Sequence, residues 1–206
     1  MHTSNYILFI CFTALLAGCK KNELPAPVKE DPKIWVQFNV NGAGYKFTSG
    51  VNSTTVKAHS KIFNSKRDFV FHIDAPELKR GLKITVFNVP QNVINQSFDN
   101  IETELDRTVI PGPYNYCYND GSVYWQPKQG DIAVEYIDTE HNEVYQSMPA
   151  SQLSFSRFEV ISVTDTEFEG VQYKLAEIKF SCLLKCHANG GYYKISNGLG
   201  VVVFGQ

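Results

Sequence analysis

The residues best suited to binding chemistry are aromatic and crowd a short segment in the middle of the chain. Tyr114, Tyr116 and Tyr118 alternate along this segment, so in an extended strand their side chains share one face. Tyr124 and Trp125 follow a few residues later. Rings offer apolar area and polar tips form hydrogen bonds, a combination used by surfaces that bind sugars or proteins. We predict these residues as ligand-binding candidates; alternatively, their face lines the core and the hydroxyl groups bond to backbone at its edge.

The cysteines beyond the N-terminal segment, Cys117, Cys182 and Cys186, permit two interpretations. On one strand at about 3.3 Å per residue, Cys182 and Cys186 lie about 13 Å apart, whereas a disulfide needs Cα atoms within about 7 Å. Either one of them pairs with Cys117, or both are small buried apolar residues, which we favour. The run from Cys182 to His187 resembles a haem-attachment motif with one extra residue, but it lies in a strand pattern. We predict no cofactor.

Metal-ligating and catalytic patterns are weak. The sequence has no His-x-x-x-His or Cys-x-x-Cys spacing and no Gly-x-Ser-x-Gly nucleophile elbow. Asp138, Glu140, Asn142 and Glu143 offer oxygen ligands for Ca²⁺, but the glycine-containing loop of a calcium site is missing, and acidic hairpin tips are ordinarily just solvated. We therefore predict no metal and no catalytic residue. The catalytic site of the alternative, an enzyme, would be a pair of carboxylates that meet across strands, as in a glycosidase.

The charge of the chain excludes one class of partner. Lys and Arg number 19 against 21 Asp and Glu, which gives a formal net charge of −2 over 206 residues. The basic residues are scattered, as in the short pairs Lys66-Arg67 and Lys79-Arg80 at expected turns. Because a nucleic-acid interface needs a basic stripe or patch, nucleic acid is not an expected partner.

The N-terminus carries an apolar segment, Tyr6–Ala17, that closes on Leu16-Ala17-Gly18-Cys19. It is too short for a transmembrane helix, which needs about 20 residues, and has the length of the apolar region of an export signal. Its end resembles the lipobox of bacterial lipoproteins. The resemblance implies a signal peptide over 1–18, cleavage before Cys19, a diacylglyceryl group on that sulfur and a fatty acid such as palmitate on the new amine. Residues 19–33, with several prolines and charges, are expected to form a flexible tether.

Residues 34–206 are expected to form one all-β domain, an antiparallel β-sandwich of roughly ten to twelve strands. Short β-branched and aromatic runs are separated by Gly, Asn and Pro, and Asn41-Gly42 is a strong hairpin signal. Ile94, Phe98, Ile101 and Leu105 follow a helical period, which predicts one short helix. The expected strands are Ile34–Val40, Tyr45–Thr48, Phe69–Ile73, Leu82–Phe87, Asp131–Ile137, Asn142–Gln146, Phe155–Val163, Tyr173–Cys186, Tyr192–Ile195 and Leu199–Phe204.

Three segments resemble small β-sandwich lipoproteins of unknown function from Bacteroidota. Asn41-Gly42 resembles their first turn, and Glu177–Cys182 followed by Tyr193–Gly198 resembles their closing hairpin. Glu177 stands where that family usually has Gly, and Ser196 replaces Thr. The resemblance implies a fold and a location, and it implies no activity.

These observations favour a protein of the cell envelope, lipid-anchored to the outer membrane on its periplasmic or surface face. The expected function is a non-enzymatic binding or structural module with a glycan or protein ligand. The alternative is an envelope hydrolase acting on a glycan, with a site assembled across strands. The expected partners are the membrane, through the anchor, and a glycan or an envelope protein.

Overall fold

The structure is a computed structural model that describes residues 33–63, 66–88, 100–117, 127–149, 154–168 and 170–205. Lys33–Gln206 form one compact unit. The predicted signal peptide, Cys19 and nearly all of the predicted tether lie outside the described residues. Within the described residues, no helix is both long enough and apolar enough to cross a membrane.

The described strands form a single 11-stranded sheet. Its order is β2-β1-β11-β10-β8-β7-β5-β4-β3, with β9 beside β10 and β6 beside β9. The strands are β1 (Trp35–Val40), β2 (Ala43–Thr48), β3 (Thr55–Phe63), β4 (Lys66–Ala75), β5 (Arg80–Asn88), β6 (Gly112–Tyr114), β7 (Ile132–Asp138), β8 (Glu143–Ser147), β9 (Arg157–Phe168), β10 (Val171–Cys186) and β11 (Tyr192–Phe204). The helices are α2 (Ile101–Thr108) and the 3-10 helix η1 (Pro76–Leu78).

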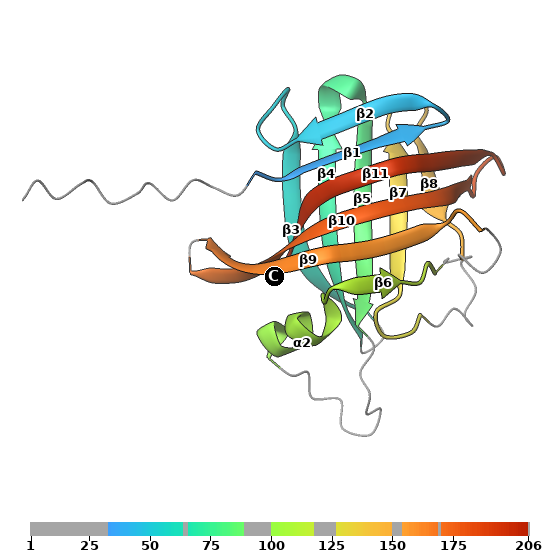
Figure 1. The fold of residues 1–206 in the computed structure, drawn as a ribbon. Coiled ribbons are helices and arrows are strands. Elements are labelled where there is room, and N and C mark those ends of the chain that lie inside the picture. Colours follow the sequence, from blue (N-terminus) through green and yellow to red (C-terminus); the bar gives the residue numbers. More distant parts are fainter. Residues whose placement is uncertain are drawn as a thin grey trace, which may run out of the picture. The chain divides into compact units, whose positions relative to one another are not determined.

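The sheet curls so that two groups of strands face each other across one core. Figure 1 shows β2, β1, β11, β10 and β9 crossing in front of β3, β4, β5 and β7. Aromatic rings join the two layers: the centroids of Phe38 on β1 and Tyr136 on β7 lie 6.2 Å apart, edge to face. Strand β10 belongs to both layers, because it pairs with β9 and β11 and then, at Leu184–Cys186, with β8. Burial of apolar side chains between the layers is the main stabilising contribution.

The predicted all-β class is confirmed, and so are the antiparallel pairing and the Asn41-Gly42 hairpin. The two layers are parts of one continuous hydrogen-bonded sheet, however, and do not form two separate sheets. Two boundaries were predicted wrongly. The strand expected to end at Val163 is β9, which runs on to Phe168, and the last two expected strands, Tyr192–Ile195 and Leu199–Phe204, are one strand, β11.

Strand β3 was missed because its sequence does not alternate apolar with polar residues. Lys57, His59 and Lys61 are exposed, and between them lie Ala58 and Ser60, which are only half-buried. Strand β3 pairs with β4 alone and forms an edge of the sheet. Exposed lysines on an edge strand hinder pairing with another chain. The same lysines lower the apolar content of β3, so its sequence does not resemble that of a strand.

Helix α2 confirms the C-terminal part of the predicted helix, whereas Ile94 and Phe98 lie outside the described residues. The side chain of Asn100 caps it by accepting a hydrogen bond from the backbone N–H of Glu102 at 3.2 Å. Ion pairs tie the helix to the sheet, from Glu104 to Arg67 on β4 at 3.0 Å and from Asp106 to Lys174 on β10 at 2.5 Å.

A β-bulge interrupts β11 at Ser196–Gly198. The register with β10 shifts between Phe180 and Cys182, and Asn197 adopts a left-handed conformation with φ of 53°. A Cβ atom on Gly198 would lie 2.6 Å from both the ring and the carbonyl oxygen of Phe180. Only glycine therefore fits at this position without moving the backbone of β10.

We predict that Gly198→Ala lowers the free energy of unfolding by about 1–3 kcal/mol, because the added methyl group overpacks the contact with β10. Gly44→Ala on β2 is the matched control, since its Cβ would meet only the Asn39 side chain at 3.4 Å. Urea denaturation followed by circular dichroism measures both. Equal stability of the two variants would contradict the predicted clash.

Candidate functional site

A cavity of about 530 Å³ lies on the outer face of β9, β10 and β11. We call it the outer pocket. It is lined by Ser154, Phe155, Arg157, Lys179, Phe180, Ser181, Lys194, Ser196, Asn197, Gly198 and Leu199. Its size is in the range of small-molecule sites, and its lining combines apolar contact with hydrogen-bonding groups.

Sheet register explains why residues far apart in sequence meet in the outer pocket. Arg157 on β9 lies opposite Ser181 on β10, and Lys179 on β10 lies opposite Leu199 on β11. Their side chains point away from the core, because the neighbouring Phe158 and Phe180 point into it. The bulge at Ser196–Gly198 disrupts the regular ladder of β11 at the same level.

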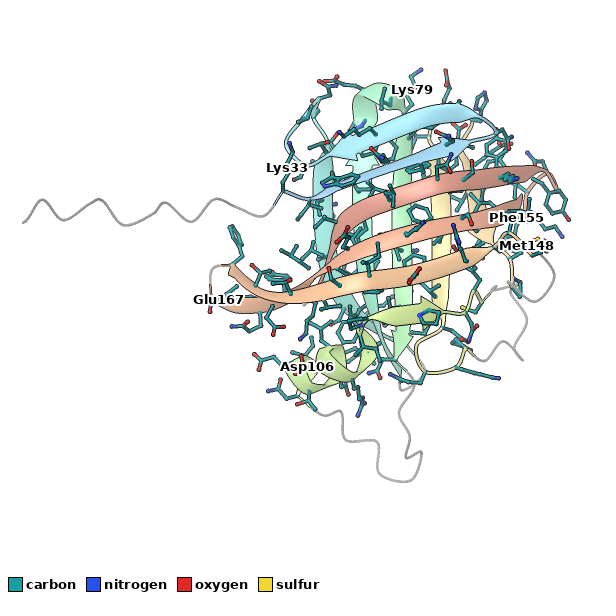
Figure 2. All side chains as sticks on the ribbon, viewed as in Figure 1. Lys33, Lys79, Asp106, Met148, Phe155 and Glu167 are labelled. Atoms are coloured by element: carbon teal, nitrogen blue, oxygen red, sulfur yellow. The ribbon has the colours of Figure 1, made fainter. Side chains whose placement is uncertain are left out.

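Phe155 overhangs the sheet from the segment that leads into β9. Its backbone carbonyl accepts a hydrogen bond from the hydroxyl group of Ser181, and the ammonium of Lys194 lies 4.5 Å from the centroid of its ring. Lys194 is itself fixed through its backbone, which exchanges two hydrogen bonds with Asn41. Figure 2 shows Phe155 at the opposite end of the β9–β10 hairpin from Glu167.

The predicted candidate Tyr116 is buried, with 4% of its surface exposed, and supports the outer pocket from within. Its hydroxyl group donates to the backbone carbonyls of Arg157 and Ser181, at 3.1 and 3.2 Å. Burial raises the pKa of Tyr116 well above its ordinary value, so it remains a hydrogen-bond donor. It therefore holds the β9–β10 ladder together at the point where the side chains of Arg157 and Ser181 line the pocket.

Tyr114 is also buried, and it fits the core alternative weighed for the tyrosine face. Its hydroxyl group accepts from the N–H of Ile110 at 2.8 Å and donates to the carbonyl of Thr108 at 2.9 Å, at the end of helix α2. Tyr118, Tyr124 and Trp125 lie outside the described residues. Period-two spacing places residues on one face of a strand but does not say which face is inside.

Cys117, Cys182 and Cys186 are free thiols and are buried, which confirms the favoured interpretation of the last two as core residues. Burial raises the pKa of Cys182 to about 12, so its thiol stays protonated and unreactive. Cys182 and Cys186 point into the core and are fully covered, whereas covalent haem attachment needs both thiols free to react with the cofactor.

The acidic tip predicted between β7 and β8 holds a charged cluster. Ligand atoms of Asp138, Glu140 and His141 lie within 4.8 Å of one another. Arg80 on β5 already pairs with both carboxylates, at 2.8 Å to Asp138 and 3.1 Å to Glu140. His141 bonds Asp138 at 3.0 Å but is 60% exposed. The cluster fastens the β7–β8 turn to β5.

A smaller cavity of about 280 Å³ lies between helix α2 and the β9–β10 hairpin. Lys174, the one cation of its lining among the described residues, contacts Asp106 and Asp165, each at 2.5 Å. Burial opposes the charge of Lys174, but hydrogen bonds to the two aspartates raise its pKa. Because the ammonium of Lys174 is already shared between two aspartates of the chain, this cavity connects helix α2 to the β9–β10 hairpin and is not a candidate ligand site.

Sequence analysis missed every side chain that lines the outer pocket as a site residue. Arg157, Lys179 and Lys194 come from three strands, and only the register of those strands brings them together. One signal was present: Ser196-Asn197-Gly198 interrupts the apolar alternation of β11, and Asn-Gly favours the left-handed backbone that a bulge requires.

The fold and the pocket together define an antiparallel β protein with a polar, basic pocket on the outside of a curled sheet. No protein-family model, curated protein or solved structure matches the chain.

We predict that NMR pH titration separates the histidines. Hydrogen bonding to Asp138 raises the pKa of His141 above 6.5, while partial burial and then the charge of Lys61 lower the pKa of His59 below it. His141→Gln identifies the signal of His141. A His141 signal that titrates below that of His59 would contradict the Asp138 pairing.

The same shifts predict the pH window over which the β7–β8 turn is most stable. A raised histidine pKa stabilises the fold below the unfolded value of 6.5, and this contribution is lost as pH rises through the folded pKa. Burial opposes ionisation of Asp138, but His141 and Arg80 lower its pKa below 3.8, so its contribution is lost only as pH falls through that lower value. Both contributions are therefore present between about pH 4 and 6.5.

Proposed function

We propose that this protein is a lipid-anchored protein of the cell envelope whose β domain binds a glycan in the outer pocket without altering it chemically. The N-terminal apolar segment and Cys19 support the export and anchoring. Anchoring by several acyl chains is stable, because each buried methylene contributes about 0.8 kcal/mol.

The observation that carries the glycan proposal is the composition of the outer pocket. It sets a half-buried ring, Phe155, beside hydroxyl groups of Ser154 and Ser196 and the amide of Asn197. A sugar presents the matching surface, since one face of its ring is apolar and its rim carries hydroxyl groups that both donate and accept. Apolar and hydrogen-bonding contacts within one cavity are typical of ligand-binding sites.

The lining of the outer pocket also favours binding over hydrolysis. Glycoside hydrolysis needs two carboxyl groups on either side of the bond, about 5–9.5 Å apart. Among the described residues, no Asp or Glu lines this pocket. The His141–Asp138 pair lies on an exposed turn and is held by Arg80, so it supports no hydrolytic site in a cleft.

We predict that Phe155→Ala weakens glycan binding roughly tenfold, since an aromatic contact contributes about 1–1.5 kcal/mol and 1.4 kcal/mol is tenfold in affinity. Phe168→Ala is the matched control, because Phe168 lies at the far end of β9, is 53% exposed and is outside the pocket. The full-length protein in detergent is screened on an array of neutral and acidic glycans, and calorimetry then measures the affinity for the best binder.

Two results would contradict the glycan proposal. One is an equal loss of affinity in Phe155→Ala and Phe168→Ala, which would place the contact elsewhere. The other is retention of no glycan on the array together with specific crosslinking of an envelope protein, which would favour a protein ligand.

We predict that the anchoring depends on one side chain. Cells grown with an alkyne analogue of palmitate should label the wild type, which should fractionate with membranes, whereas Cys19→Ser should be unlabelled. Cys117→Ser is the control, since its buried thiol cannot be the acylated group. Labelling that survives in Cys19→Ser would refute lipidation at this residue.

A further inference from the structure

The outer pocket has a pronounced charge asymmetry. The whole chain carries slightly more acidic than basic residues, 21 against 19. The described lining of the pocket contains Arg157, Lys179 and Lys194 and no carboxylate. Placing like charges together without a partner is unfavourable, and a folded protein ordinarily avoids it.

The three cations lie close together for a geometric reason. Arg157 lies opposite Ser181, so Lys179, two residues along β10, is its diagonal neighbour at a distance of about 7–8 Å. Lys194 reaches the same cavity from β11 and lies over the ring of Phe155. The guanidinium and the two ammonium groups thus enter one cavity from three adjacent strands.

These cations differ from the paired ones elsewhere in the described part of the chain. Lys61, Lys79, Lys83 and Lys174 each have a carboxylate within 4.0 Å. None of the three pocket cations has such a partner among the described residues. Glu159 faces Lys179 from β9 but forms no ion pair with it and does not line the pocket. Glu177 lies two residues from Lys179 on the same face of β10, where it accepts a hydrogen bond from Ser162 at 3.4 Å, and it does not line the pocket either. Two nearby carboxylates leave the three cations with a net positive charge.

An acidic group on the ligand would supply the missing partner. Arg presents a planar fork that matches the oxygens of a carboxylate or a sulfate, and the lysines add point charges beside it. The serine hydroxyl groups, Asn197 and the Phe155 ring then remain for the neutral parts of a sugar. A neutral glycan would leave the three cations unneutralised.

We infer that the ligand of the outer pocket is an acidic saccharide, whose carboxylate or sulfate group binds among Arg157, Lys179 and Lys194. This inference rests on the proposed glycan-binding function and specifies the chemical class of the glycan. It also assigns roles within the site: the cations select for the anion, and Phe155 and the neutral polar groups contact the sugar ring.

The test compares an acidic sugar with its neutral ester, with a second acidic sugar and with a free anion. The full-length protein in detergent is titrated by calorimetry with an oligomer of galacturonic acid, with the methyl ester of that oligomer, with a sulfated galactose oligomer and with sodium sulfate. We expect at least one acidic oligomer to bind, the neutral ester to bind at least tenfold more weakly than the acid if the carboxylate is the bound group, and affinity to fall as salt is raised.

Variants that each remove one positive charge test where the acidic group of the ligand binds. Arg157→Gln and Lys179→Gln should each weaken binding of the acidic oligomer about tenfold or more, because a hydrogen bond to a charged group contributes about 1.5–3 kcal/mol. Lys57→Gln removes one charge from the exposed edge strand β3 and should have no effect. Because all three side chains are exposed, each variant should fold, which circular dichroism checks.

The outcomes separate the two proposals. Equal affinity for the galacturonate oligomer and its ester, with no binding of the sulfated oligomer, would overturn the acidic ligand and leave glycan binding intact. Sodium sulfate competing as strongly as the best oligomer binds would reduce the site to a simple anion site. Failure of these acidic probes while a neutral glycan of the array binds would overturn the acidic ligand alone, and failure of every sugar probe together with an empty glycan array would overturn both proposals.

Discussion

The rest of the structure depends on the pairing of strand β10, which joins the two layers of the sheet. From Lys174 to Lys185 it keeps β11 along one edge, while its other edge pairs with β9 as far as Ser181 and then with β8 from Leu184. One strand thus belongs to both layers, and the sheet closes over a single core without becoming two sheets. The alternation of β10, with Ile178, Phe180, Cys182 and Leu184 inward, supplies much of that core.

The outer pocket lies beside the point where β10 changes partner. The ladder with β9 ends at Ser181, where the hydroxyl group of Tyr116 reaches the backbone carbonyls of Arg157 and Ser181 from the core. On the outside, Ser181 holds the segment of Phe155, and the bulge of β11 opens the opposite wall. Buried Tyr116 holds the backbone of the pocket from the core side. The charged groups of Arg157, Lys179 and Lys194 remain on the solvent side, where a ligand can reach them.

Sequence patterns predicted what depends on neighbours along the chain. Alternation and turn residues gave most strands, and Asn41-Gly42 gave the first hairpin. The patterns failed where tertiary packing decides the outcome. Strand β3 was missed because it is polar on its exposed face, and the spacing of the tyrosines did not show whether Tyr116 points into or out of the core. The cations of the outer pocket were invisible for the same reason. Arg157 and Lys194 are distant in sequence, and only the order and register of the strands place them together.

The main proposal is that the outer pocket is the ligand-binding site of this protein. Titration of the isotope-labelled protein with the galacturonate and sulfated oligomers, followed by amide NMR shifts, tests it most directly. We expect the largest shifts at Arg157, Ser181 and Ser196–Gly198, around the lining of the pocket. The largest shifts at Glu102–Asp106 and Gln172–Lys174, around the cavity beside helix α2, would contradict it.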